Sequence, residues 1–207
     1  MKRIAALILL CAAAALSIET QAFERLVVRR AVENPRHAVA TDYQSLKPAQ
    51  GNPVVVLETV KGTIEIEFFA KDAPKTVARL LTLVRQNFYR GQRFHRVETN
   101  FLIQIGDPAT RDFTKRARWG RGGSGQDIGV AEIVKTRRHV RGAVGMAHGG
   151  RPERADSQFY IMRGARPSLD GKYAIVGRVI SGMDVVDKTE LTDLVRRVYV
   201  KGEARQP

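Results

Sequence analysis

The sequence predicts a mainly β domain, a closed antiparallel barrel with helices over its open ends. Three observations predict it: short strand-like segments follow one another from residue 54 onward, turn signals separate them, and only two segments have helical spacing. A chain of 207 residues is long enough for one domain of about 130–160 residues plus extra segments. With 43% hydrophobic and 27% charged residues, the composition excludes wholesale disorder.

The first two strands are predicted to form a hairpin. Residues 54–59 (VVVLET) are rich in β-branched side chains, and Lys61-Gly62 is a turn signal. Residues 63–68 (TIEIEF) alternate apolar and charged side chains. That alternation predicts one buried face and one face in water.

A helix is expected next. Asp72 is a good N-cap residue, and Pro74 falls in the first turn, where its missing N–H costs nothing. Apolar residues then recur at helical spacing, which predicts one buried face. They are Val77, Leu80, Leu81, Val84 and Phe88.

The rest of the domain alternates short strands with loops. Further strands are predicted at residues 94–97, 101–105, 142–146, 158–162 and 174–179. Residues 107–130 form a long loop rich in Gly and Arg, and a second helix is expected to begin near Met183.

The N-terminus has the three-part pattern of a secretory signal peptide. Lys2 and Arg3 precede an uncharged apolar run at residues 4–16, and residues 17–22 turn polar, with a cleavage site expected after Ala22. The run is shorter than the about 20 residues of a membrane span, although an uncleaved membrane anchor is the alternative. Cleavage would also remove Cys11, the single cysteine, and a thiol-free chain suits an oxidising compartment.

These features predict the organisation of the chain. A signal peptide at 1–22 precedes a basic N-terminal arm at 23–53, a domain at 54–200 and a C-terminal tail at 201–207. We expect an exported protein, located in the periplasm, that is monomeric and keeps no stable membrane span after cleavage.

Several familiar kinds of catalytic site are absent from the sequence. The run GRGGSG at residues 120–125 lacks the Gly-Lys-Ser/Thr ending of a phosphate-binding loop, and Ser124 is not in a Gly-x-Ser-x-Gly elbow. The four histidines are scattered without metal-ligand spacing. The sequence therefore argues against metal-dependent and covalent nucleophilic catalysis.

Six ordered groups of residues together resemble the cyclophilin family of peptidyl-prolyl cis/trans isomerases. They are residues 94–96 (FHR), 101–107 (FLIQIGD), 120–123 (GRGG), 145–147 (GMA), 156–161 (DSQFYI) and 169–173 (LDGKY), followed by residues 177–179 (GRV) and 182–183 (GM). The match spans about residues 54–187. The resemblance implies an eight-stranded antiparallel barrel capped by two helices, no cofactor, and substrates that are proline-containing segments of folding proteins.

The reaction that the family catalyses is rotation about an X–Pro peptide bond. Resonance makes the barrier about 18–20 kcal/mol, and uncatalysed exchange takes tens of seconds. No bond breaks, so the site needs only a dry pocket for the proline ring and a donor aimed at the prolyl nitrogen. That nitrogen regains a lone pair as the bond twists, so a fixed donor there stabilises the transition state selectively.

The resemblance implies a role for each of nine residues. Arg96 matches the catalytic arginine, and Gln104 matches the glutamine that holds the substrate carbonyl. The apolar wall of the proline pocket is matched by Phe101, Leu102, Tyr160 and Leu169. Ala147 and His148 match the strip that pairs with the substrate backbone, and Tyr173 stands where the family commonly has His.

Each assignment has a plainer alternative. Arg96 could be one more surface arginine, Gln104 an ordinary polar strand residue, and the four wall residues plain barrel core. His95 fits a packed histidine supporting Arg96 better than an acid or base. Ser168 replaces a common aromatic residue at the pocket rim, and this departure bears on substrate preference.

Charge supports a second function. The chain has 35 Lys+Arg and 21 Asp+Glu, a net charge of +14, which attracts acidic partners. The basic loop contains Arg111, Lys115, Arg116, Arg118 and Arg121. The alternative is therefore a cyclophilin-shaped basic module that docks acidic partners and catalyses weakly. Nucleic acid is disfavoured by the export signal and by the lack of interleaved aromatic residues.

Overall fold

The computed structural model describes residues 51–204. The predicted signal peptide (1–22), residues 23–50 of the predicted arm and residues 205–207 lie outside the described residues. Within residues 51–204, no helix combines the length and apolar character needed to cross a bilayer.

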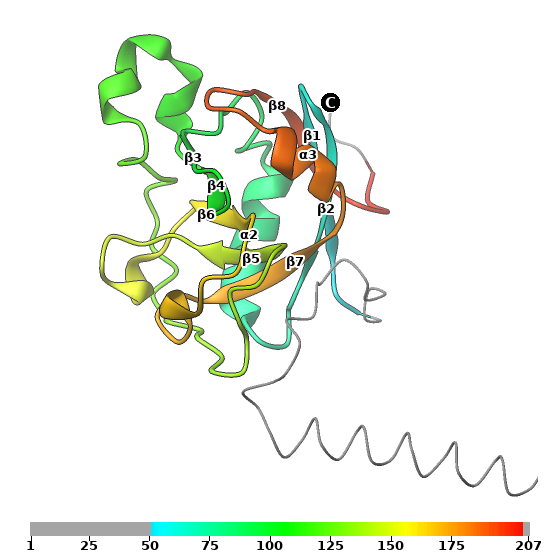
Figure 1. Ribbon diagram of the computed structural model, residues 1–207, viewed down its shortest axis with the longest axis vertical. Coiled ribbons are helices and arrows are strands. Elements are labelled where there is room, and N and C mark those ends of the chain that lie inside the picture. The colour runs from blue at the N-terminus through cyan, green and yellow to red at the C-terminus, as the bar shows by residue number, and fades with distance from the viewer. Residues whose placement is uncertain (1–50, 205–207) are drawn as a thin grey trace, which may run out of the picture. The chain divides into compact units, whose positions relative to one another are not determined.

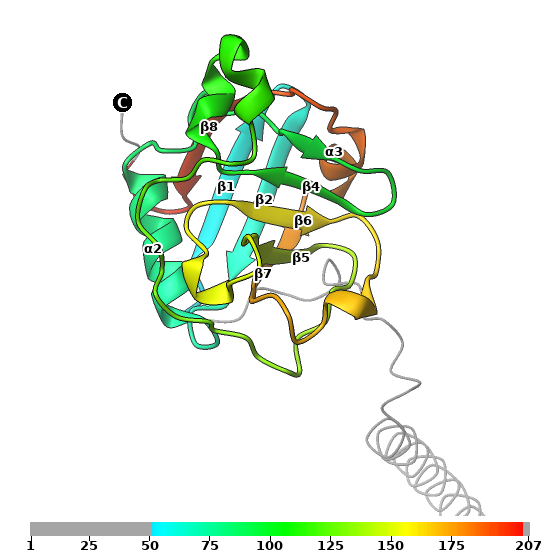
Figure 2. The same cartoon turned by 90° about the vertical axis from the view of Figure 1, so that its left-hand side faces the viewer.

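The described residues form one curled antiparallel sheet with two α-helices (Figures 1 and 2). The strands are β1 (Val54–Thr59), β2 (Gly62–Phe68), β3 (Arg96–Val97), β4 (Leu102–Ile105), β5 (Ala143–Met146), β6 (Phe159–Met162), β7 (Ile175–Ser181) and β8 (Val195–Val200). Their order across the sheet is β3-β4-β6-β5-β7-β2-β1-β8. The helices, α2 (Pro74–Arg85) and α3 (Met183–Lys188), lie at opposite sides of the sheet in Figure 2, where α2 packs against β8 and α3 against β2.

The predicted strands and both predicted helices are confirmed, and β8 is an addition to them. Its sequence, VRRVYV, places Val195, Val198 and Val200 in the core. The adjacent pair Arg196-Arg197 breaks the strict alternation of apolar and charged residues that predicts a strand, so the sequence pattern did not indicate β8.

Closure of the barrel is less complete than predicted. The edge strands β3 and β8 are not paired with each other in the sheet. The segment before β3 pairs instead with the first residue of β8 and with the residues before it: the Gly91 N–H donates to the Val195 carbonyl (2.9 Å), and the Phe94 N–H donates to the Asp193 carbonyl (3.1 Å). The result is a curled sheet whose edges are joined by loop segments.

The start of α2 differs from the prediction. Asp72 does not cap the helix, because its carboxylate forms an ion pair with Arg137, and the N-cap residue is Ala73. Glu132, far away in sequence, accepts hydrogen bonds from the backbone N–H of Lys75 (3.1 Å) and of Thr76 (2.8 Å). A carboxylate just beyond the predicted 107–130 loop thus satisfies the open N–H groups of Lys75 and Thr76 in the first turn.

Two apolar clusters lie on opposite faces of the sheet. The larger fills the interior and includes the apolar face of α2. The smaller consists of buried residues on the outer face, with Phe101, Ala147 and Tyr173 packed against it. Its buried members are Phe69, Leu102, Ala143, Tyr160, Met162 and Ile175. Alternation along β6 divides the strand: Phe159 and Ile161 face inward, whereas Tyr160 and Met162 face outward.

One buried ion pair departs from the expectation for β2. The TIEIEF pattern predicts a wet face, yet Glu67 has no exposed surface. Arg178, its cross-strand partner on β7, is also buried and places Nε 2.5 Å from a Glu67 carboxylate oxygen. The predicted wet face is therefore confirmed at Thr63, which is exposed, and at Glu65, which is partly exposed, and it is wrong at Glu67, where Arg178 on β7 pairs with the carboxylate.

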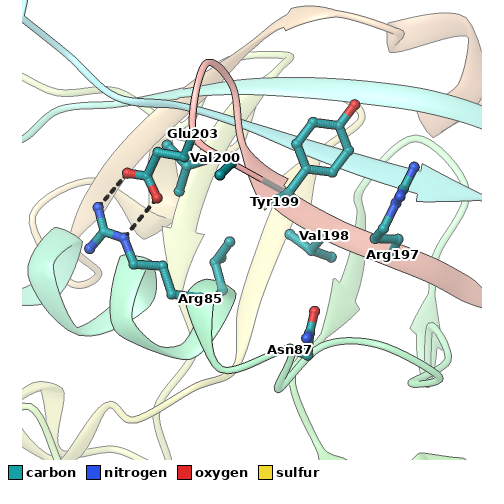
Figure 3. A pocket seen from close by; sticks show the side chains of 9 residues that line it. Arg85, Asn87, Arg197, Val198, Tyr199, Val200 and Glu203 are labelled. Atoms are coloured by element: carbon teal, nitrogen blue, oxygen red, sulfur yellow. Dashed lines mark hydrogen bonds and ion pairs between the residues drawn. The ribbon is translucent and has the colours of Figure 1, made fainter. Parts of the chain in front are cut away.

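The end of the described chain is tied to α2. Figure 3 shows Arg85, in the last turn of that helix, forming an ion pair with Glu203 beside a hollow of about 70 Å³ between α2 and β8. The Lys201 N–H also donates to the Val54 carbonyl (2.8 Å). Residues 201–204 of the predicted tail therefore lie against the domain.

Candidate active site

All nine site residues predicted from the sequence line one pocket of about 240 Å³ on the outer face of the sheet. They are Arg96, Phe101, Leu102, Gln104, Ala147, His148, Tyr160, Leu169 and Tyr173. The wall residues therefore do not belong to the main interior core, which was the plainer alternative, because Leu102 and Tyr160 lie in the outer cluster.

Strand register aligns the polar and apolar parts of the pocket. Arg96 on β3 is opposite Gln104 on β4, Gln104 is opposite Tyr160 on β6, and Tyr160 is opposite Gly145 on β5. Directly opposed residues on neighbouring strands have Cβ atoms about 5 Å apart. The row therefore places a guanidinium, an amide and an aromatic ring side by side.

Arg96 projects from this row at the pocket edge. Its side chain is 46% exposed, and its Nε donates to Glu98 (2.7 Å). The guanidinium carbon lies 5.5 Å from the centre of the Phe101 ring, and that of Arg166 lies 5.0 Å from the same ring. Glu98 and Arg166, which the sequence did not single out as site residues, thus frame the Arg96–Phe101 pair.

Gln104 is held by a second glutamine. Its Nε2 donates to the Gln158 Oε1 (2.8 Å), and the Gln158 Nε2 donates to the carbonyls of Gly120 (3.0 Å) and Gly122 (2.6 Å). This chain of amides fixes the Gln104 side chain and leaves the second N–H of its Nε2 free to donate to an incoming carbonyl. Gln158 belongs to the DSQFYI motif, but its distance along the chain from Gln104 gives no indication of this contact.

The carboxylates of Asp107 and Asp156 hold the glycine run at residues 120–123 in position. Asp107 accepts from the backbone N–H of Gly120 (2.7 Å) and of Gly122 (3.1 Å). A Cβ at Gly122 would come within 2.5 Å of the Asp107 Oδ1, and one at Gly123 within 2.4 Å of the Asp156 Oδ2. Glycine is required here because side chains would displace the carboxylates that hold the loop beside the pocket.

The far wall is built by ring contacts. The His148 ring stacks on Tyr173 with centroids 4.3 Å apart, and its Nε2 lies 3.2 Å from the Lys172 carbonyl. Tyr173 meets Tyr160 edge to face at 6.0 Å. The Ala147 N–H donates to the Gln158 carbonyl (2.9 Å), which ties this strip to the sheet.

His95 precedes Arg96 but is poorly suited to proton transfer. Burial lowers its pKa, an effect that outweighs the opposing influence of Asp107. Its ring lies against Gly120, where a Cβ would come 3.1 Å from Cδ2. The ring is packed as expected, but among the described residues neither ring nitrogen has a hydrogen-bond partner, so its support of Arg96 stays a prediction.

A second hollow of about 390 Å³ adjoins the pocket. The two share Gln104, Ala147 and His148, and the second is also lined by Arg121 and Arg154. Together they make a groove with an apolar pocket at one end and charged residues of both signs at the other, where Asp127 and Asp156 accompany the two arginines and Arg154 is ion-paired with Asp127 (3.1 Å).

The arrangement suits binding and orientation. Across residues 51–204, no group of three or more His, Cys, Asp or Glu side chains is placed to hold a metal ion. The pocket combines an apolar wall with a guanidinium and an amide whose positions are set by neighbouring hydrogen bonds. Such a site can seat a small ring, exclude water and donate a hydrogen bond at its edge.

Comparison with known sequences identifies relatives over most of the described residues. Residues 54–203 match the family described as "Cyclophilin type peptidyl-prolyl cis-trans isomerase/CLD". The chain is 42% identical over 148 residues to "Probable peptidyl-prolyl cis-trans isomerase" of Brucella abortus, covering 70% of this chain and 75% of that one. It is 37% identical over 145 residues to human "Peptidyl-prolyl cis-trans isomerase-like 3", covering 70% and 86%.

Solved structures share the fold. A cyclophilin type peptidyl-prolyl cis-trans isomerase of Cryptosporidium parvum superposes with a TM-score of 0.63 at 24% identity, covering 74% of this chain and 99% of that one. A second structure of that protein, in the presence of the dipeptide Ala-Pro, has a TM-score of 0.62 at 24% identity, covering 72% and 99%.

Proposed function

The chain belongs to the cyclophilin-type peptidyl-prolyl cis-trans isomerase family and is such an isomerase, and from this premise we propose that the pocket formed by its nine predicted residues is the catalytic site. The proline ring of the substrate enters against Phe101, Leu102, Tyr160 and Leu169. Arg96 stands at the pocket edge, where the prolyl nitrogen of a seated ring would lie.

Catalysis follows from the position of Arg96. A planar amide nitrogen offers no lone pair, whereas a twisted one does. The guanidinium then donates a hydrogen bond that the ground state cannot accept, which lowers the barrier without a bond being broken. Gln104, held by Gln158, orients the substrate carbonyl, and the apolar wall excludes competing water.

The single observation that carries this assignment is the meeting of Arg96, Gln104 and the apolar wall in one pocket. The pocket has a volume of about 240 Å³, and a structure of the Cryptosporidium relative was obtained in the presence of Ala-Pro. An assay of cis-to-trans exchange in a proline tetrapeptide tests it. We expect saturable catalysis that free Ala-Pro inhibits competitively, and a rate equal to the uncatalysed exchange would refute it.

We also propose that the protein is exported and assists folding of proline-containing proteins in the periplasm. The support is the basic start, the apolar run at residues 4–16 and the polar stretch ending at Ala22. We expect protein recovered from the producing cell to lie in the periplasmic fraction with Phe23 as its first residue. Recovery in the membrane fraction with an intact N-terminus would favour the anchored alternative.

Charge beside the groove leads to a prediction about substrates. Arg121 lines the adjoining hollow, whereas Arg111, from the same predicted cluster, is exposed but engaged by the backbone, its Nε donating to the Arg90 carbonyl (3.0 Å). Exposed charges act over about 8–10 Å at physiological salt, so Arg121 and its neighbours would speed the association of acidic segments.

An acidic proline peptide should therefore have a higher kcat/KM than a basic one of equal length, and added salt should narrow the difference. Arg121→Glu should reduce the difference more than Arg196→Glu, a matched charge change on the exposed side of β8. Equal efficiencies of the two peptides at low salt would mean that the loop does not steer substrate.

A further inference from the structure

Beneath the proline pocket lies a chain of buried polar groups that the proposed mechanism leaves unused. The His139 side chain has no exposed surface, and its Nδ1 lies 2.9 Å from the Asp170 Oδ1. On the other side of the ring, Nε2 lies 2.8 Å from the Tyr160 hydroxyl. Tyr160 lines the pocket, whereas His139 does not. The chain therefore runs from the partly exposed Asp170 through the buried His139 ring to the pocket wall.

The hydrogen bonds determine which ring nitrogen carries the proton. The Asp170 Oδ1 also accepts from the backbone N–H of His139 (2.7 Å), and Arg138 lies 3.6 Å from the other carboxylate oxygen. Because a carboxylate only accepts, Nδ1 must donate to it. Burial lowers the pKa of His139, which leaves the ring neutral and Nε2 with a lone pair.

The Tyr160 hydroxyl then has one role left, that of donor to Nε2. Its hydrogen points into the protein, away from the pocket. Gly145 on β5 makes room for this arrangement, because a Cβ there would come within 2.4 Å of both the Cζ and the oxygen of Tyr160. The tyrosine ring is thus held across Gly145 by a bond to a buried acceptor.

We propose that His139 is a positioning residue for the proline pocket: by accepting the Tyr160 hydroxyl, it fixes the ring and keeps a polar hydrogen out of an apolar wall. The inference rests on the proposed function, since it concerns the same pocket. This hydrogen bond explains how the apolar wall of the pocket can contain a tyrosine whose hydroxyl does not attract water into the pocket. Without the acceptor, the hydroxyl would turn toward the pocket or draw water into it.

Two substitutions separate the two bonds of His139. His139→Asn retains an amide N–H where Nδ1 donates to Asp170 and lacks the acceptor for Tyr160. His139→Gln reaches farther and retains an acceptor near Nε2. Wall contacts are made in the ground state as well as in the transition state, so their loss should appear in KM rather than in kcat.

We expect His139→Asn to raise KM for a proline tetrapeptide about tenfold, the scale of one unsatisfied buried hydroxyl, with kcat within about twofold of the original. His139→Gln should keep KM within about threefold. Adding Tyr160→Phe to His139→Asn removes the orphaned hydroxyl, and KM should return to the value of Tyr160→Phe alone. A double variant no better than His139→Asn would overturn the proposal, as would an unchanged KM in His139→Asn.

Two further measurements separate this proposal from the assignment of the pocket. Phe101→Ala removes a wall residue directly: if it raises KM while His139→Asn does not, the pocket stands and the role of His139 falls. If neither changes KM, the pocket is not the proline site. Nitrogen-15 spectra of the protein should show His139 protonated at Nδ1 alone, and protonation at Nε2 would refute the proposed bond without reference to activity.

Discussion

Replacing Arg96 with alanine should lower the rate of prolyl isomerisation about 10²–10³-fold, the usual cost of losing one preorganised transition-state donor. Arg96 is half exposed, and its bonds to Glu98 are the kind of surface pair that contributes little to stability. We therefore expect the fold to survive the substitution. The loss should fall on kcat, because the donor reaches the prolyl nitrogen only as the amide twists.

Arg96→Lys sharpens the test. Lysine keeps the charge but lacks the planar fork that contacts Glu98 and a second acceptor together. Most of the loss should remain in this variant, whereas Arg196→Ala, an exposed arginine on β8, should keep its activity. If Arg96→Ala, shown by circular dichroism to be folded, keeps more than about half of its activity, Arg96 is not the donor expected here.

The largest effect on stability should come from Arg178→Met. This change leaves the Glu67 carboxylate in the interior, where it has no exposed surface. Removing one partner of a buried ion pair costs about 3–5 kcal/mol. For a chain of this size the midpoint of thermal unfolding should fall by about 6–20 °C, measured by scanning calorimetry.

A double substitution shows whether the loss of the guanidinium beside the Glu67 carboxylate is the cause. Glu67→Leu combined with Arg178→Met removes both charges and should recover much of the lost stability, because an apolar pair of similar volume often matches a buried ion pair. Arg196→Met, the matched exposed change, should shift the free energy of unfolding by less than about 0.5 kcal/mol. A double variant as unstable as Arg178→Met alone would assign the effect to packing.

Local sequence patterns were sufficient to predict an element when the residues that indicate it lie within that same segment. The hairpin β1–β2 was predicted from its β-branched run and its Lys61-Gly62 turn, and α2 from Pro74 and its apolar face. The pocket residues were instead assigned from the resemblance to the cyclophilin family, which short ordered motifs carry. Each of these signals depends on near neighbours along the chain, which is why it can be read before folding.

Other properties depend on which segments become neighbours. Glu67 has the spacing of a wet residue, and only the pairing of β2 with β7 buries it beside Arg178. Asp72 has the position of a helix cap, but Arg137 takes its carboxylate and Glu132 caps the helix. In each case a partner many residues away changes the local preference.

The pocket itself shows the same division. Arg96, Gln104 and Tyr160 could be assigned from their motifs, but their alignment in one row follows from the register of β3, β4 and β6. Gln158 and His139, which hold two of these side chains, have no local signature, because each acts on a residue on another segment. Hydrogen bonds between distant segments form only once the sheet curls, so their partners become identifiable only in the folded chain.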